Sequence, residues 1–433
     1  MGASIRCTHF FLGIKMKLKQ ISLILSQLLL ASTISYAETP CQDKNFWQAW
    51  YDDSQFKGFG MPPDSKDVAN AQYRFAENYF IGNVLTKDYT RAINLFQRAA
   101  NSGLNQAHFK LGLINHYGKG KVRDLNKAYA HYERSAKNNN PEAQFNLGLI
   151  NRYGLGRSKN MSKAFEWFTK SAVQQTALDI NHCKIQLAGV MEAQFNLAQM
   201  YHYGLGVSKD IAQAAYWYEK AALNNMKEAQ FNLAKLLIKG KGVKYDFNRA
   251  MENYRLAAQQ GLAEAQLNLA QMLHYGPKNF QDHALAYVWY TKAAKKGFSE
   301  AEFNLGLMKH YGRGTHRDYQ AALSHYLKSA KGGQSDAHLN LGYLYHYGLG
   351  TSVDNKKAFS YFTKAAQEGF PQAEYHLGII YERGLWVKKY LDQATSWFEK
   401  AAEQNLTEAQ LIMSERAIRE PDDLNIYVKN EII

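Results

Sequence analysis

Residues 193–222 read AQFNLAQMYHYGLGVSKDIAQAAYWYEKAA, and the first five letters return throughout the chain. The same five residues begin at Ala143 and Ala229. Near copies begin at Ala71, Ala107, Ala265, Ala301, Ala337, Ala373 and Ala409. The steps between these alanines are 36 residues, except for one step of 50. A fixed period of this size predicts stacked supersecondary units rather than the core of a globular enzyme.

The first half of each unit has the spacing of an amphipathic helix. Counting Ala193 as position 1, Leu197 lies at position 5 and Met200 at position 8. At 100° per residue these positions share one helical face. Position 12 is glycine in nine full repeats, and glycine accepts the left-handed conformation that ends a helix. These glycines are Gly82, Gly118, Gly154, Gly204, Gly240, Gly276, Gly312, Gly348 and Gly384.

The second half has the signals of another helix. Asp210, at position 18, can accept amide protons of the next helical turn as an N-cap. The same place holds Asp88, Asp124, Asp246, Asp282, Asp318 and Asp354. Position 33 is Gly or Asn wherever the spacing is regular, which predicts a second left-handed stop. Those residues are Gly103, Asn139, Asn225, Gly261, Gly297, Gly333, Gly369 and Asn405. Each unit is therefore predicted to be a helical hairpin that buries its apolar faces against its neighbours.

The pattern A-x-x-x-L-G-x-x-Y-x-x-G-x-G-V-x-x-D-x-x-x-A-x-x-W-x-x-K-A-A, across Ala193 to Ala222 and its copies, resembles the Sel1-like repeat. The resemblance extends from Ala71 to about Glu408. It implies an all-α fold, a right-handed α-solenoid related to the tetratricopeptide repeat. Departures are Ile238 and Lys239 in one unit, Pro277 and Lys278 in one loop, and Trp386 in place of the second loop glycine.

The two ends of the chain differ from the repeats. Three lysines precede an apolar run, Ile21 to Leu30, and then Ser35-Tyr36-Ala37. We expect 1–37 to be a signal peptide cleaved after Ala37, with Met16 giving a more typical length, and the mature chain to be periplasmic or secreted. The alternative is an uncleaved anchor. We further expect an aromatic-rich cap over 38–70, nine repeats over 71–408, and a capping half-repeat and tail over 409–433.

The net charge of the chain and its cysteines indicate which partners to expect. Removing residues 1–37 lowers the net charge from +14 to +10. This excess suggests acidic partners such as anionic glycans, lipid headgroups or acidic protein segments, or it only keeps a long surface soluble. Nucleic acid is disfavoured by the expected compartment. The mature chain keeps Cys41 and Cys183, and the sequence leaves open whether they form any disulfide.

One face of the predicted first helix is the candidate binding surface. Position 4 is asparagine in Asn146, Asn196, Asn232, Asn268, Asn304 and Asn340. Position 11 is tyrosine in Tyr117, Tyr153, Tyr203, Tyr275, Tyr311 and Tyr347. Position 10 is histidine in His116, His202, His274, His310 and His346. The resemblance implies that first helices line a concave groove in which such asparagines hold a ligand backbone, and an amide does offer both a donor and an acceptor. The alternative is that the asparagines bond only to neighbouring helices or loops. One histidine per layer predicts no metal site, but the histidines could change the charge of the groove near pH 6.

A 14-residue insertion breaks the period within 173–192. It is either an enlarged loop or extra turns on the flanking helices. Insertions in solenoids are often used for binding, although a tolerated surface loop explains this one equally well.

The motifs argue against catalysis. Ser54 to Lys57 fits S-x-x-K, but the S-D-N and K-T-G partners of that motif are absent. No P-loop, dinucleotide fingerprint or G-x-S-x-G occurs, and no cofactor is predicted. Some exported Sel1-like proteins are cysteine-rich and carry β-lactamase labels, and this chain lacks those cysteines. We therefore expect a non-catalytic adaptor that holds an extended peptide or a protein in its groove. A module that binds cell-wall glycan is the alternative, followed by an enzyme acting on the cell wall.

Overall fold

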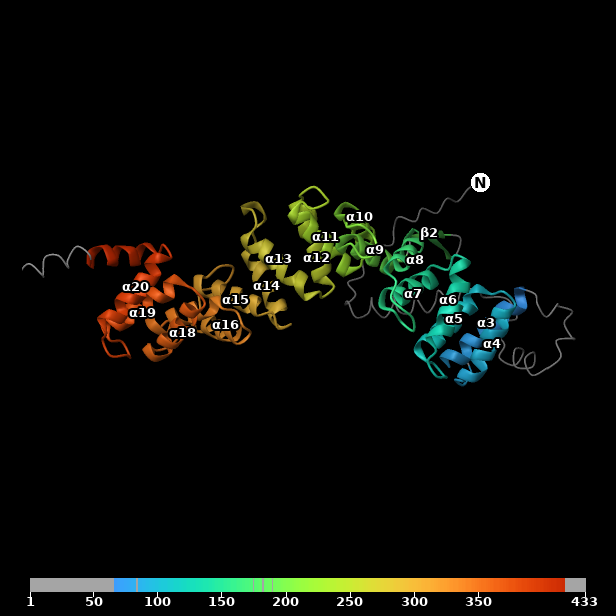
Figure 1. The fold of residues 1–433 in the computed structure, drawn as a ribbon, viewed down its shortest axis with the longest axis horizontal. Coiled ribbons are helices and arrows are strands. Elements are labelled where there is room, and N and C mark those ends of the chain that lie inside the picture. Colours follow the sequence, from blue (N-terminus) through green and yellow to red (C-terminus); the bar gives the residue numbers. More distant parts are fainter. Residues whose placement is uncertain (1–65, 83–84, 174, 181–182, 189, 417–433) are drawn as a thin grey trace, which may run out of the picture. The chain divides into compact units, whose positions relative to one another are not determined.

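The structure, a computed structural model, describes residues 66–82, 85–173, 175–180, 183–188 and 190–416 (Figure 1). The expected signal peptide, residues 38–65 of the expected cap, Cys41 and residues 417–433 lie outside these ranges. The chain divides into two compact units between Trp217 and Tyr218. No helix in the described ranges has the length and apolarity needed to span a bilayer.

The first and second helices of successive hairpins alternate regularly along each unit. Unit 1 contains α3 (Lys66–Ile81), α4 (Tyr89–Asn101), α5 (Asn105–Tyr117), α6 (Leu125–Lys137), α7 (Pro141–Tyr153), α8 (Met161–Val173), β1 (Gln175–Ile180), β2 (Cys183–Ala188) and α9 (Met191–Tyr203). The division falls within α10 (Ile211–Leu223). Unit 2 continues with α11 (Lys227–Lys239), α12 (Phe247–Gln259), α13 (Ala263–Tyr275), the short 3-10 helix η3 (Lys278–Phe280), α14 (His283–Ala294), α15 (Ser299–Tyr311), α16 (Tyr319–Lys331), α17 (Asp336–Tyr347), α18 (Asn355–Gln367), α19 (Pro371–Arg383) and α20 (Leu391–Glu403). Within each unit every helix packs on the next one along the chain, which is the predicted stack of hairpins. Odd-numbered helices are the first helices of the hairpins and even-numbered ones the second helices. Residues 407–416, in the expected half-repeat, are also helical.

The helix ends follow the sequence signals. The seven predicted N-cap aspartates each accept a hydrogen bond from the backbone N–H three residues later, at 2.8–3.0 Å. The glycine or asparagine at position 33 has positive φ in every regular unit, with Asn139 at 60° and Gly333 at 87°. The glycine at position 12 is left-handed too, except at Gly276, where that prediction is wrong. Pro277 follows Gly276, and a residue before proline is held in extended backbone, here at φ −66° and ψ −177°.

In each hairpin one large ring of the second helix is buried. Position 26, on the second helix, carries a fully buried Tyr or Phe such as Tyr132, Tyr326 or Phe362. In five hairpins this ring faces a glycine at position 6 of the first helix. A Cβ at Gly148 would lie 2.5 Å from Phe168, and one at Gly342 would lie 2.5 Å from Phe362. The missing side chain therefore lets the two helices of a hairpin approach closely.

The insertion is a β-hairpin. Strands β1 and β2 pair antiparallel, from Gln175 opposite Ala188 to Ile180 opposite Cys183. The prediction of extra helical turns is wrong, because α8 ends at Val173 and α9 begins at Met191. The hairpin joins these two helices in unit 1.

Candidate functional site

The position 11 tyrosines form the most exposed aromatic series on the first helices. We call them the tyrosine row: Tyr117, Tyr153 and Tyr203 in unit 1, and Tyr275, Tyr311 and Tyr347 in unit 2. Their exposed fractions lie between 52% and 63%. Each tyrosine is the last residue of its helix, because the glycine that follows ends the helix. Tyrosines exposed at this regular interval are a candidate surface for contact with another molecule.

The end of one first helix reaches the start of the next. In unit 2 the Tyr275 hydroxyl donates to Oδ1 of Asn304 at 2.7 Å. In unit 1 Arg152 donates to Oδ1 of Asn196 at 2.5 Å and to Oε1 of Gln199 at 2.9 Å. These bonds join α13 to α15 in unit 2 and α7 to α9 in unit 1, so the end of one helix and the start of the next lie on one surface in these two pairs.

The side-chain amides of the position 4 asparagines already form hydrogen bonds with the backbone of their own helices. The Nδ2 of each donates to the backbone carbonyl four residues earlier, at 2.7–3.1 Å, in Asn146, Asn196, Asn232, Asn268, Asn304 and Asn340. Asn146 and Asn304 are also buried. A ligand could therefore meet the acceptor Oδ1 and one remaining N–H, because the other N–H of the amide is already used. At Asn196 and Asn304 the Oδ1 is bonded as well.

The histidines at position 10 support the tyrosine rings. His116, His202, His274 and His310 stack on the tyrosine that follows, with centroids 4.1–4.8 Å apart, while His346 meets Tyr347 edge-on at 4.7 Å. Burial lowers the pKa of His116, His310 and His346, and lowers that of His274 to about 4. These four rings are therefore mainly neutral at pH 7, and His274 titrates well below pH 6.

Basic side chains beside the row were missed by the sequence reasoning. Arg152 lies 5.5 Å from the ring centroid of Tyr153, and Arg313 lies 5.5 Å from that of Tyr311. Arg152 occupies position 10, where five other units have histidine, and this replacement could have been found in the repeats. The surface thus presents aromatic faces, phenol hydroxyls and guanidinium groups, which suit an extended peptide with acidic or polar groups.

Comparison with known proteins agrees with the repeat geometry. The Sel1 repeat family matches residues 69–104, 105–140, 141–174, 192–226, 227–262, 263–298, 299–334, 335–370 and 371–406. Among solved structures, a protective antigen present in uropathogenic Escherichia coli strains, displaying an SLR fold, is 30% identical with a TM-score of 0.59, and 82% of each chain is covered. A Sel1 repeat protein from Oxalobacter formigenes is 27% identical with a TM-score of 0.50, covering 75% of this chain and 89% of its own. No curated protein matches significantly.

These matches cover the described hairpins almost completely. Sel1 repeats generally form scaffolds for protein–protein interaction, and the fold is typically non-catalytic. With nine matched repeats over most of its length, the chain belongs to the Sel1 repeat family.

Proposed function

We propose that the protein is a non-catalytic adaptor that binds an extended segment of a partner protein along the tyrosines of the row within one unit. The observation that carries the proposal is the regular exposure of these tyrosines. A tyrosine gives a large contact area at a small cost in conformational entropy and keeps a hydroxyl for hydrogen bonding.

The electrostatics support an acidic or polar partner. Arg152 and Arg313 lie beside exposed rings of the row, and the chain as a whole is basic. Burial lowers the pKa of His116, His274, His310 and His346, so these rings add little charge at pH 7 and the arginines contribute the local positive potential. Salt should therefore weaken the association.

We also propose that the adaptor works after export, in the cell envelope or beyond it. The support is the basic segment, apolar run and Ser35-Tyr36-Ala37 sequence at the start of the chain. N-terminal sequencing of the protein recovered from fractionated cells would test this directly. An N-terminus near Glu38 is the expected result, and an intact N-terminus in the cytoplasm would overturn it.

The adaptor role is tested by crosslinking in envelope extract with three proteins in parallel. They are the parent chain, a variant with Tyr275, Tyr311 and Tyr347 changed to Ala, and a control with Tyr245 and Tyr390 changed to Ala. The control tyrosines are each 54% exposed but lie outside the row. We expect one protein partner that crosslinks to first helices, is kept by the control and is lost by the triple variant.

Other outcomes discriminate between the alternatives. Equal capture by all three proteins would move the binding site away from the row. Glycan without protein in the eluates would replace the adaptor with a glycan-binding module.

A further inference from the structure

Second helices repeat an aromatic–lysine pair on their outer surface. Position 25 is Trp167 in α8, Trp289 in α14 and Trp397 in α20. Three residues later, at position 28, each helix has a lysine whose Nζ lies over the indole, at 4.6, 3.8 and 4.3 Å from the ring centroid. Position 28 is basic in every full repeat but one, in which it is Leu256.

These indoles fill a defined space between hairpins. Trp167 packs against a core cluster that includes Ala136 of the preceding second helix and Leu147 of its own hairpin. Trp397 packs in the same way against a cluster that includes Ala366 and Leu377. Both clusters include the alanine at position 30 of one hairpin and the leucine at position 5 of the next.

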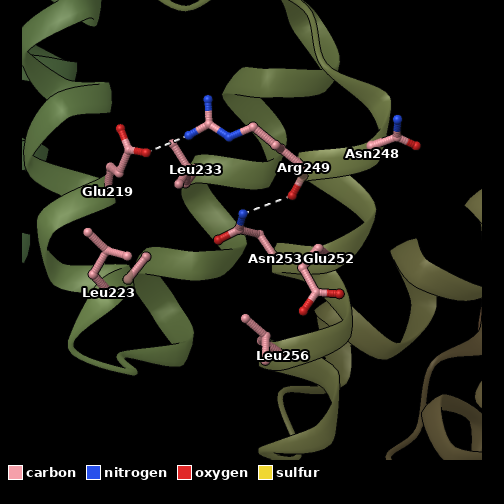
Figure 2. A pocket seen from close by; sticks show the side chains of 9 residues that line it. Glu219, Leu223, Leu233, Asn248, Arg249, Glu252, Asn253 and Leu256 are labelled. Atoms are coloured by element: carbon pink, nitrogen blue, oxygen red, sulfur yellow. Dashed lines mark hydrogen bonds and ion pairs between the residues drawn. The ribbon is translucent and has the colours of Figure 1, made fainter.

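In unit 2, α12 has neither residue of the pair, whereas α16 keeps the lysine, Lys328, but has His325 at position 25. In α12, position 25 is Asn253 and position 28 is Leu256. The equivalent alanine and leucine, Ala222 and Leu233, line an open pocket with a volume of about 450 Å³ (Figure 2). This volume is within the range of roughly 300–1,000 Å³ found for small-molecule sites. Asn253 and Leu256, at the two positions of the pair, also line this pocket, and we infer that asparagine leaves open the space that an indole fills in other layers.

The walls of the pocket are apolar. Leu223, which is 78% exposed, and Leu256 lie on its two sides, and the buried Leu233 lines it further in. In regular layers position 31 is mostly polar, so Leu223 adds apolar surface where the repeat does not require it. Burial of such surface by a ligand is favourable by roughly 25 cal/mol per Å².

The rim is polar, and each of its two carboxylates is paired with an arginine. Glu219 accepts from Arg249 at 2.5 Å, and Glu252 accepts from Arg255, which does not line the pocket. The lining thus holds two carboxylates and one guanidinium, in a chain with a net charge of +14. Asn253 donates its Nδ2 to the Arg249 carbonyl at 2.8 Å, which leaves its Oδ1 to accept. A ring with an N–H donor and a neighbouring cation complements these groups.

We propose that this pocket binds a tryptophan side chain of a partner protein, with a basic residue of the partner beside Glu252. The partner would supply the indole and the cation that other layers supply from their own second helix. The indole N–H would donate to Asn253, and the ring would cover Leu223, Leu233 and Leu256. The site lies on second helices and α11, apart from the tyrosine row, so it is an additional contact and does not depend on the proposed function.

The test uses the full chain and the capped dipeptide acetyl-tryptophanyl-lysine amide carrying 5-fluorotryptophan, observed by fluorine NMR. We expect saturable broadening and a shift of the fluorine signal at millimolar dipeptide. The same dipeptide with glutamate in place of lysine should bind several-fold more weakly, because its carboxylate faces Glu219 and Glu252.

Two variants locate the binding. Asn253→Trp with Leu256→Lys restores the regular pair, fills the pocket and should abolish binding while circular dichroism stays that of the parent. Leu223→Asp changes an exposed residue at the mouth, is not expected to disturb folding, and should weaken binding several-fold. Ser324→Trp adds an indole at an exposed second-helix position and should leave binding unchanged.

Two results would overturn the proposal. Binding that survives in the filled variant and in Leu223→Asp would overturn the proposal, and so would the absence of any dipeptide binding to the parent chain. The variant with Tyr275, Tyr311 and Tyr347 changed to Ala should still bind the dipeptide. Its failure to bind would assign the indole to the tyrosine row instead.

Discussion

The hydroxyl of Tyr275 donates to the side-chain carbonyl of Asn304, 2.7 Å away on the first helix of the next hairpin. The two residues hold positions 11 and 4, which the sequence had singled out as separate parts of a ligand site. Here they bind each other, and the bond fixes the exposed Tyr275 ring against the following repeat. The same contact therefore orders the candidate binding surface and links two hairpins.

Changing Tyr275 to Phe should remove this bond and keep the ring. We expect the free energy of unfolding to fall by about 0.5–1.5 kcal/mol, the net value of one such hydrogen bond. Urea unfolding followed by circular dichroism measures the change. Tyr311→Phe is the matched control, because no described contact uses the Tyr311 hydroxyl as a donor. An equal loss in both variants would show that the Tyr275 bond contributes nothing specific.

The close approach of the two helices in a hairpin leads to a second prediction. A Cβ on Gly342 would lie 2.5 Å from the buried ring of Phe362. Gly342→Val should therefore force the two helices apart and cost at least about 1–3 kcal/mol, as overpacking of a core does. Ser360→Val, on the exposed side of the same hairpin, is the control and should change stability by less than about 0.5 kcal/mol. A thermal unfolding midpoint equal to that of the control would contradict the packing argument.

The period predicted the fold because the signals that end and start helices are local. Asp210 and Asn225 act through their own backbone, so their roles as cap and left-handed stop could be read from the sequence alone. Gly276 does not adopt the left-handed conformation of the other position 12 glycines, and the reason is equally local, since Pro277 follows it. Periodicity could not reveal the contacts between hairpins, such as Arg152 to Asn196, because they depend on how successive hairpins pack.

The candidate site was predicted less completely for the same reason. Helical spacing placed Asn304 and Tyr275 on binding faces, but it could not show that the amide of Asn304 is bonded on both sides. The pocket in α12 was visible in the repeats as the replacement of an aromatic–lysine pair by Asn253 and Leu256. Recurring residues do not reveal it, because a pocket in a repeat protein arises where a recurring large side chain is absent.

Acid should weaken unit 2 through His376. Its ring stacks on Phe362 at 4.9 Å, and burial, with His346 nearby, lowers its pKa to about 4. The unfolded chain, with a histidine pKa near 6.5, then binds more protons than the folded chain between pH 4 and 6.5. Stability is therefore complete above pH 6.5 and is lost as the pH falls toward 4, by about 2 kcal/mol from this residue between pH 7.5 and 5.

His376→Phe keeps an aromatic ring in the same place and removes the titration. The variant should lose less stability than the parent when urea unfolding is compared at pH 7.5 and pH 5. His316→Gln changes a histidine whose side chain is 79% exposed, and it should keep the pH dependence of the parent. Parallel pH profiles for the parent and His376→Phe would show that His376 does not carry the effect.

Deletion of residues 175–188 should leave a folded protein. These residues are the β-hairpin, and their removal brings Gly189 to position 33 and Val190 to position 34. Those positions elsewhere hold the left-handed glycine or asparagine and, often, an apolar residue after it, so the shortened chain regains the 36-residue period and a regular helix stop. A shorter connection also costs less closure entropy, by about 0.6 kcal/mol for each halving of its length. We expect helical circular dichroism per residue to be equal or higher and the thermal midpoint to be unchanged or raised. A marked loss of stability would mean that the hairpin supports the packing of α8 and α9. Unchanged stability together with loss of the crosslinked partner would instead place part of the binding surface on the hairpin.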